Sequence, residues 1–132
     1  MARAQWPLLF EKPTIQVVLT LAQGGHKTTR NLLADTGAGT ANARFELILD
    51  ETDCLLCGGT SVQTLKLGGA YIGSFPRYFL RVAIPQLNFD ELVSTVGVPA
   101  TSGGLDGIAG FRFLNRFHYG NFGNPGEFGL EA

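Results

Sequence analysis

The sequence predicts a mostly β domain with many tight turns and little helix. The 132-residue chain contains 18 glycines and 10 phenylalanines, and its β-branched residues are gathered in short segments. Glycine is favoured in tight turns, whereas aromatic and β-branched residues are favoured in strands. A chain of this length fits one domain with a substantial hydrophobic core, so we expect a single domain over residues 1–132.

Two strands are predicted ahead of the first motif. Residues 14–21 alternate between apolar and polar types, as in a half-buried strand. The apolar face of this strand consists of Ile15, Val17, Leu19 and Leu21. A turn is predicted at 23–26, where two glycines adjoin. Residues 28–34 then return as the partner strand, which leads directly to Asp35.

A second unit has the same order of features. A strand beginning at Thr64 is followed by the turn Gly68-Gly69 and by a strand over 75–84. One face of the latter strand consists of Tyr78, Leu80, Val82 and Ile84. A glycine-rich loop at 102–104 precedes the apolar pair Ile108-Ala109, which Gly110 closes. The chain therefore resembles a degenerate internal repeat in which only the first copy carries Asp-Thr-Gly.

The remaining segments are less regular. Apolar spacings of three and four within residues 111–117 predict one short helix near the C-terminus. Residues 120–126 are rich in turn formers, and 127–132 are compatible with a terminal strand. Residues 85–102 fit either an irregular loop or a brief helix over 90–93.

Composition restricts the possible partners. Charged residues make up 16% of the chain, against about 25% in an average soluble protein, and apolar types make up 45%. Much of the surface is then neutral or covered by a partner, which favours self-association. The net charge of −1 lacks the basic excess that nucleic-acid binding demands.

Apolar runs and leader sequences give no indication of a membrane. The runs are far shorter than the roughly 18 residues of a membrane span, and the first residues do not have the pattern of a signal peptide. We therefore expect no membrane segment and a chain that is soluble as written. An anchor outside these 132 residues would leave no trace in them, and the compartment stays open.

The cysteines suggest one further possibility. Cys54 and Cys57 are spaced as Cys-x-x-Cys, which fits a redox pair or half of a zinc site. A structural zinc site requires a second pair of ligands, and His26 and His118 are isolated from each other in the sequence. Two reduced thiols are the simpler interpretation, and a metal-binding or redox β domain is the third-ranked one.

Asp35-Thr36-Gly37-Ala38 is the most informative segment of the chain. It follows the apolar Leu32-Leu33-Ala34, which places one carboxylate on a tight turn at the end of a buried strand. Hydrolysis by paired carboxylates requires a second acid, and this motif occurs only once in the chain. A second copy of the chain would then have to supply the other acid.

The two blocks that end the repeat units, 32–38 and 106–114, together resemble the retropepsin family of aspartic proteases. The resemblance is closest to the bacterial and retrotransposon-like members, and it covers roughly residues 14–131. It implies a retropepsin-like closed β-barrel or sandwich with one short helix near the C-terminus. It also implies a homodimer with the active site at the subunit boundary, a polypeptide substrate and no cofactor.

The resemblance assigns roles to individual residues. Asp35 would be the catalytic acid, and Thr36, Gly37 and Ala38 would support its loop. Ile108, Ala109 and Gly110 would form the second, apolar loop, and 127–132 would join a dimer sheet. A substrate-covering hairpin, the flap, would have its tip at Cys57, Gly58, Gly59 and Thr60.

Two positions depart from the family pattern. Retroviral members usually carry an acid after Asp-Thr-Gly-Ala and an arginine after the second glycine, whereas this chain has Gly39 and Phe111. Because both partners of that ion pair are missing together, neither charge is stranded. Dimer stability would then have to come from apolar packing and strand pairing.

These residues predict an aspartic endopeptidase that hydrolyses extended polypeptides at mildly acidic pH, with water activated by the two Asp35 carboxylates of a homodimer. The alternative is a catalytically silent dimer of the same fold that acts as a peptide-binding or assembly module. Asp106 lies between Leu105 and Gly107, as turn acids often do, and is not expected to be a second catalytic acid.

Overall fold

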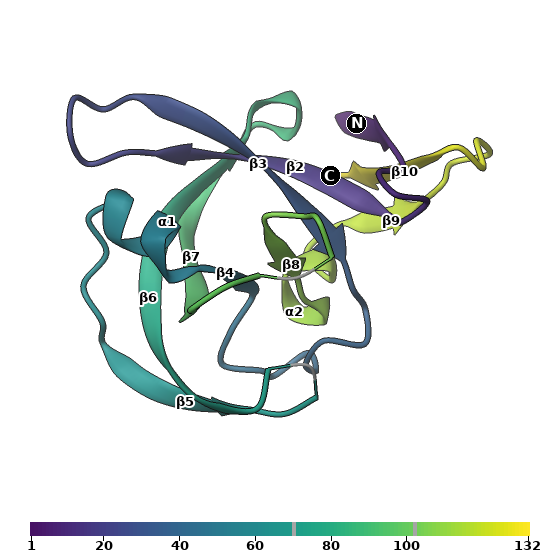
Figure 1. The fold of residues 1–132 in the computed structure, drawn as a ribbon. Coiled ribbons are helices and arrows are strands. Elements are labelled where there is room, and N and C mark those ends of the chain that lie inside the picture. The colour runs from purple at the N-terminus through teal and green to yellow at the C-terminus, as the bar shows by residue number, and fades with distance from the viewer. Residues whose placement is uncertain (70, 102) are drawn as a thin grey trace.

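The computed structural model describes residues 1–69, 71–101 and 103–132. The protein is mostly β, with a closed six-stranded mixed barrel and two short α-helices (Figure 1). In chain order the elements are β1 (Arg3–Pro7), β2 (Thr14–Thr20), β3 (Lys27–Ala34), β4 (Leu47–Asp50), α1 (Glu51–Leu56), β5 (Gln63–Leu67), β6 (Gly73–Ile84), the 3₁₀ turn η1 (Pro85–Leu87), β7 (Phe89–Val98), β8 (Gly107–Ala109), α2 (Phe111–Leu114), β9 (His118–Gly120) and β10 (Glu127–Glu131).

The barrel has the strand order β2-β3-β8-β4-β7-β6. It closes where Val18 and Leu19 of β2 pair with Ala83 and Val82 of β6. β8 pairs in parallel with β3, and β4 pairs in parallel with β7, while the other barrel pairs are antiparallel. β5 adds to the outer edge of β6 and forms a hairpin with it. β8 is therefore enclosed between β3 and β4, at the centre of the fold.

The barrel interior is filled by the predicted apolar faces. Ile15, Val17 and Leu19 of β2 are buried, and so are the alternate residues of β6 that begin at Tyr78. Leu21 lies beyond the end of β2 and is half-buried. Period-two alternation thus identified both strands correctly. A smaller cluster, made of Ile48, Leu65, Val96 and Val98, packs beneath the β5–β6 hairpin.

The two ends of the chain form a separate three-stranded antiparallel sheet, in the order β1-β10-β9. Figure 1 shows both termini on the same side of the barrel. Ala4, Trp6 and Leu130 from this sheet belong to the same core cluster as the barrel residues. The predicted terminal strand at 127–132 is confirmed as β10, but it pairs with β1 and β9 of its own chain.

The prediction for residues 85–102 was wrong. Most of this segment is β7, a ten-residue strand paired with both β4 and β6. Residues 93–98 are all buried, including Ser94 and Thr95. A strand covered on both faces shows no alternation, so its sequence pattern resembles neither a half-buried strand nor a helix.

The helix prediction needs two corrections. α2 spans only Phe111–Leu114 within the predicted segment 111–117, although Phe113 and Phe117 still meet with ring centroids 5.6 Å apart. α1 was not predicted. It begins after Asp50, whose carboxylate accepts a hydrogen bond from the backbone N–H of Thr52 and caps the helix.

Gly107 is required by the close approach of β8 to β4. A Cβ atom at this position would lie 2.3 Å from the carbonyl oxygen of Ile48 and 2.8 Å from Leu49 Cδ2. We expect Gly107→Ala to lower the free energy of unfolding by about 1 to 3 kcal/mol, because backbone must shift to admit the methyl group. Urea denaturation measures this change.

The matched control is Gly68→Ala, since nothing lies within 4 Å of a Cβ atom built there. An alanine at 107 that costs no more than the alanine at 68 would contradict the packing of β8 described here.

Candidate active site

Asp35 lies on a tight loop directly after β3. Its backbone N–H donates to the carbonyl of Ala109 at 2.9 Å, and its own carbonyl accepts from the N–H of Ala38 at 3.1 Å. The Oδ1 atom accepts a hydrogen bond from the N–H of Gly37 at 2.9 Å. Asp35 is half-buried, while Thr36 and Gly37 are exposed. The loop thus holds one carboxylate at the surface in a defined backbone setting.

The second apolar loop lies against the first. In the parallel β3–β8 ladder, Ala34 pairs with Ala109 and Leu33 with Ile108, so the two predicted blocks run side by side. The N–H of Phe111 donates to the carbonyl of Ala38 at 2.9 Å. A Cβ atom at Gly110 would lie only 2.8 Å from that carbonyl oxygen. The blocks that were singled out in the sequence are therefore in direct backbone contact.

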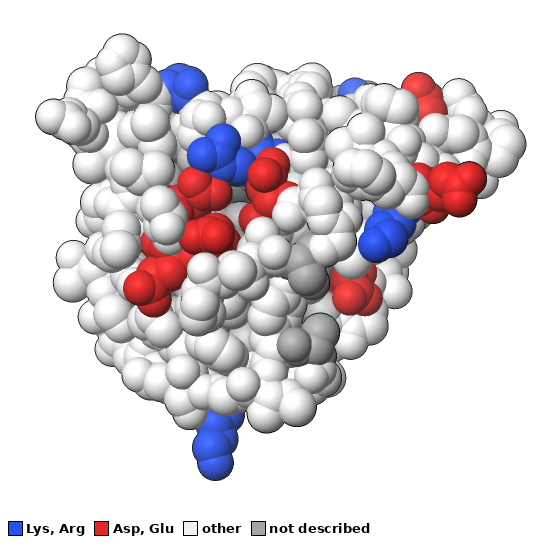
Figure 2. Space-filling view, in the orientation of Figure 1, with Lys and Arg blue, Asp and Glu red and all other residues white. Residues whose placement is uncertain are grey.

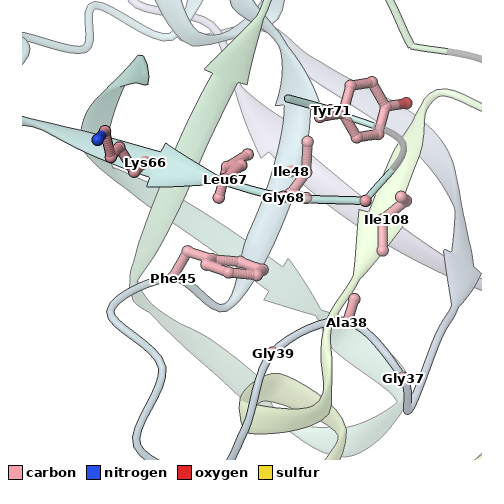
Figure 3. Close-up of a pocket in the computed structure, with 11 residues that line it drawn as sticks. Gly37, Ala38, Gly39, Phe45, Ile48, Lys66, Leu67, Gly68, Tyr71 and Ile108 are labelled. Carbon is pink, nitrogen blue, oxygen red and sulfur yellow. The ribbon is translucent and has the colours of Figure 1, made fainter. Parts of the chain in front are cut away.

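A cavity of about 410 Å³ lies beside the Asp35 loop. Figure 3 shows the loop residues Gly37, Ala38 and Gly39 on one side, with Leu67 and Gly68 of the β5–β6 hairpin across from them. The remaining lining residues are mostly apolar, namely Phe45, Ile48, Ile108 and Tyr71, together with Lys66 and Gly69. The space therefore suits an apolar group that enters between the loop and the hairpin.

The predicted position of the flap tip was wrong. Cys57 caps the C-terminus of α1, and the N–H groups of Gly58 and Gly59 donate to carbonyls of that helix. Gly58 has a φ of +75°, the left-handed conformation that commonly ends helices, and Thr60 follows in the exposed loop. The glycine pair ends a helix and does not turn a hairpin. The hairpin beside the cavity is β5–β6, connected between Leu67 and Gly73.

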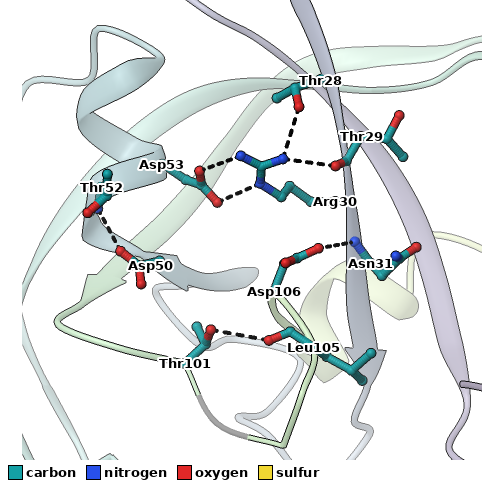
Figure 4. Close-up of polar contacts among 10 residues, drawn as sticks. All are labelled: Thr28, Thr29, Arg30, Asn31, Asp50, Thr52, Asp53, Thr101, Leu105 and Asp106. Atoms are coloured by element: carbon teal, nitrogen blue, oxygen red, sulfur yellow. Dashed lines mark hydrogen bonds and ion pairs between the residues drawn. The ribbon is translucent and has the colours of Figure 1, made fainter. Parts of the chain in front are cut away.

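Asp106 has a structural role, as expected. Its Oδ2 atom accepts a hydrogen bond from the N–H of Asn31 at 2.8 Å (Figure 4). The N–H of Asp106 in turn donates to the carbonyl of Asn31. Asn31 is on β3, four residues before Asp35, and four residues of extended strand separate the two positions by about 13 Å. Asp106 fixes the loop ahead of β8 and does not pair with Asp35. Ser102, in the predicted glycine-rich loop, lies outside the described residues.

The Cys-x-x-Cys segment is part of α1 and its cap. Arg30 on β3 binds Asp53 of α1 through two hydrogen bonds of 2.8 and 2.9 Å, which dock the helix on the barrel (Figure 4). Cys54 is buried, and Cys57 is half-buried. Over the described ranges, no three His, Cys, Asp or Glu side chains are grouped so that they could hold a metal ion.

Three charged residues near the site, Glu46, Arg112 and Arg116, were not predicted from the sequence. Arg112 of α2 donates to the carbonyl of Ala43 at 2.8 Å, and Arg116 binds the carboxylate of Glu46 through both Nε and Nη2. Hydrogen bonding to Glu46 raises the pKa of Arg116. One feature of the sequence could have indicated this ion pair. Glu46 directly precedes the apolar residues 47–49, and a carboxylate buried at such a position needs a paired cation.

The surface agrees with the low charge of the sequence. Figure 2 shows a largely uncharged face with acidic side chains gathered over α1, where Asp50, Glu51 and Asp53 lie, and with further acidic side chains towards the right edge of the view. Within the described parts of the chain, no helix is long and apolar enough to cross a membrane.

The two thiols are expected to react very differently. Burial raises the pKa of Cys54 to about 12 and also raises that of Cys57. Burial favours the neutral Cys54 thiol in the folded protein. The folding free energy that comes from keeping this thiol protonated is fully present below the ordinary cysteine pKa, and it is lost as the pH rises towards 12. At pH 8 we expect a thiol reagent to label Cys57 slowly in the folded protein and Cys54 only after unfolding.

Cys57→Ser should remove native-state labelling, and Cys54→Ala should leave it unchanged. Rapid labelling of both thiols before unfolding would contradict the placement of Cys54 in the core.

Comparisons of the chain with protein families, with curated proteins and with solved structures each found no match. What can be inferred about function therefore comes from the residues and contacts of this chain.

Proposed function

We propose that this chain is one subunit of a homodimeric aspartic endopeptidase of retropepsin type, in which each subunit supplies one Asp35. The observation that carries the proposal is the parallel pairing of β3 with β8, which brings the Asp-Thr-Gly-Ala block against the Ile-Ala-Gly block beside a cavity. The catalytic carboxylate of each subunit lies on the loop that this pairing fixes.

The chemistry requires two carboxylates that share one proton. One carboxylate draws a proton from water while the protonated one donates to the departing group. Like charges a few ångströms apart cannot both ionise cheaply, so the pair titrates as a unit with one pKa lowered and the other raised. The rate should then follow a bell-shaped profile at mildly acidic pH.

The neighbours of Asp35 suit these roles. Thr36 is exposed in the isolated chain, so its hydroxyl is accessible to a second copy across a two-fold axis. Gly37 lets the backbone pass close to the shared water, and Ala38 provides no hydroxyl donor to the carboxylate. Absence of that donor favours a less acidic working range.

The substrate in this proposal is an extended polypeptide. It would lie between the Asp35 loop and the β5–β6 hairpin, which takes the flap role that the sequence had suggested for 57–60. Extended peptides bind through backbone hydrogen bonds with alternate side chains in pockets. Phe45, Ile48 and Ile108 in the cavity lining favour apolar or aromatic side chains next to the cut bond.

The departures at Gly39 and Phe111 are compatible with this proposal. Gly39 has a φ of +78°, and a Cβ atom there would lie 3.2 Å from the Phe45 ring, so the loop has little room for an acid at 39. The competing hypothesis, a silent peptide-binding dimer, predicts the same cavity but no hydrolysis.

Asp35→Asn is expected to reduce cleavage of a peptide library by about 10³-fold or more, because the amide can neither take nor give the shared proton. Asp106→Asn is the matched control, since its amide oxygen can still accept from the N–H of Asn31. Pepstatin should block the wild type. Mass spectrometry of the peptides measures cleavage, and peptide binding without cleavage would favour the silent module.

Mixing the two kinds of chain tests whether the active unit contains two copies of Asp35. If subunits pair at random, equal amounts of wild type and Asp35→Asn leave about half of the activity per wild-type chain. A one-chain enzyme would keep all of its activity in the mixture. Dilution of the wild type should also lower the activity per chain as monomers accumulate.

A further inference from the structure

The segment that returns from Asp35 to the barrel is held by two arginines from α2 and the turn after it. Arg112 donates to the carbonyl of Ala43 at 2.8 Å. Arg116 binds Glu46 with a fork of two hydrogen bonds, of which Nη2 to Oε1 is 2.9 Å. Glu46 is the last residue before β4, so the fork lies where the Asp35 loop rejoins the barrel.

Glu46 is an unusual place for a carboxylate, because the residue is only 2% exposed. Its backbone is also fully used: its N–H donates to the carbonyl of Ser94, and its carbonyl accepts from the N–H of Gly110, both at 2.8 Å. A buried carboxylate is tolerated when a cation with matching geometry pairs with it. The fork of Arg116 therefore fixes the side chain of a residue whose backbone already joins β7 to the second loop.

Arg116 is itself well oriented. Its Nη1 atom lies 3.3 Å from Glu91 Oε1, and its guanidinium group lies 5.4 Å from the centre of the Phe89 ring. Contacts on three sides limit the directions in which the fork can point. An arginine whose geometry is set in this way can act as a rigid tie and not merely as a counter-charge.

We propose that Glu46 and Arg116 are a positioning pair that sets the placement of the Asp35 loop within each subunit. This inference rests on the function proposed above. The pair takes over, inside one chain, the bracing that Gly39 and Phe111 cannot supply. Because two loops must meet with their carboxylates close enough to share a proton, a small displacement of either loop uncouples them.

The variants separate positioning from stability. Arg116→Met leaves the buried Glu46 carboxylate without its main cation and is expected to destabilise the fold as well. Replacing both residues by Met removes both charges. This double variant is expected to regain stability but not the ion pair that holds the Asp35 loop. Arg116→Lys keeps the charge but not the fork. Arg81→Met is the control, because Arg81 forms an exposed ion pair with Asp90 on the outside of β6.

In the double variant we expect kcat to fall by about tenfold to a hundredfold. The alkaline limb of the rate–pH profile should move to lower pH, since weaker coupling lowers the raised pKa of the carboxylate pair. Arg116→Lys should be intermediate, and Arg81→Met should match the wild type. A double variant that is folded, with wild-type kcat and pH profile, would overturn the inference.

Hydrogen exchange followed by mass spectrometry provides a readout independent of activity. Peptides covering 35–46 should exchange faster in the double variant, while those covering β2 and β6 should not change. Unchanged exchange at 35–46 would also overturn the inference. Wild-type protein that cleaves nothing would instead contradict the proposed function, and the exchange result would still decide whether the pair holds the loop.

Discussion

The parallel pairing of β3 with β8 is the constraint on which the rest of the structure depends. Three residue pairs, from Leu32–Gly107 to Ala34–Ala109, join the end of one hairpin to the middle of the barrel. β8 has β4 on its other side and so has no edge of its own. Gly107 leaves room for the close approach of β4, and the pairing of Ala34 with Ala109 puts the Ala109 carbonyl where it can accept from the N–H of Asp35. Packing at the centre of the fold thereby sets the placement of the candidate catalytic loop.

Local pattern was enough to predict elements with one buried face. Ile15 to Leu19 and Tyr78 to Ile84 alternate strictly, and both strands formed as predicted. The pattern failed for Val93–Val98, which are buried on both faces of their strand. It also failed for α1, a short helix whose ends are set by the cap at Asp50 and by the left-handed Gly58. Glycine pairs were ambiguous for the same reason: Gly68-Gly69 belongs to a hairpin connection, and Gly58-Gly59 ends a helix.

The candidate site was predictable only where its residues are adjacent in sequence. Asp35 to Ala38 and Ile108 to Gly110 are contiguous blocks with recognisable chemistry, and the structure brings them together. Glu46 and Arg116 are 70 positions apart, and neither belongs to a motif. The pairing of these two charges depends on the tertiary structure, because it requires the turn after α2 to pack beside the start of β4. A single sequence carries no record of that packing.

In the proposed homodimer, the terminal sheet would limit how two copies of the chain can meet. β10 is paired on both sides within its own chain, so a partner strand can add only at β1 or β9. The N–H of Leu8 donates to the carbonyl of Gly126, and the carbonyl of Ala2 accepts from the N–H of Ala132. The backbone groups of even-numbered β1 residues therefore face β10, and those of odd-numbered residues face the outer edge. At that edge Pro7 has no N–H to donate to a further strand. Trp6 and Leu130 already close the core of one chain. The core of one chain is thus closed by its own terminal sheet, and the proposed dimer would form by contacts outside that core.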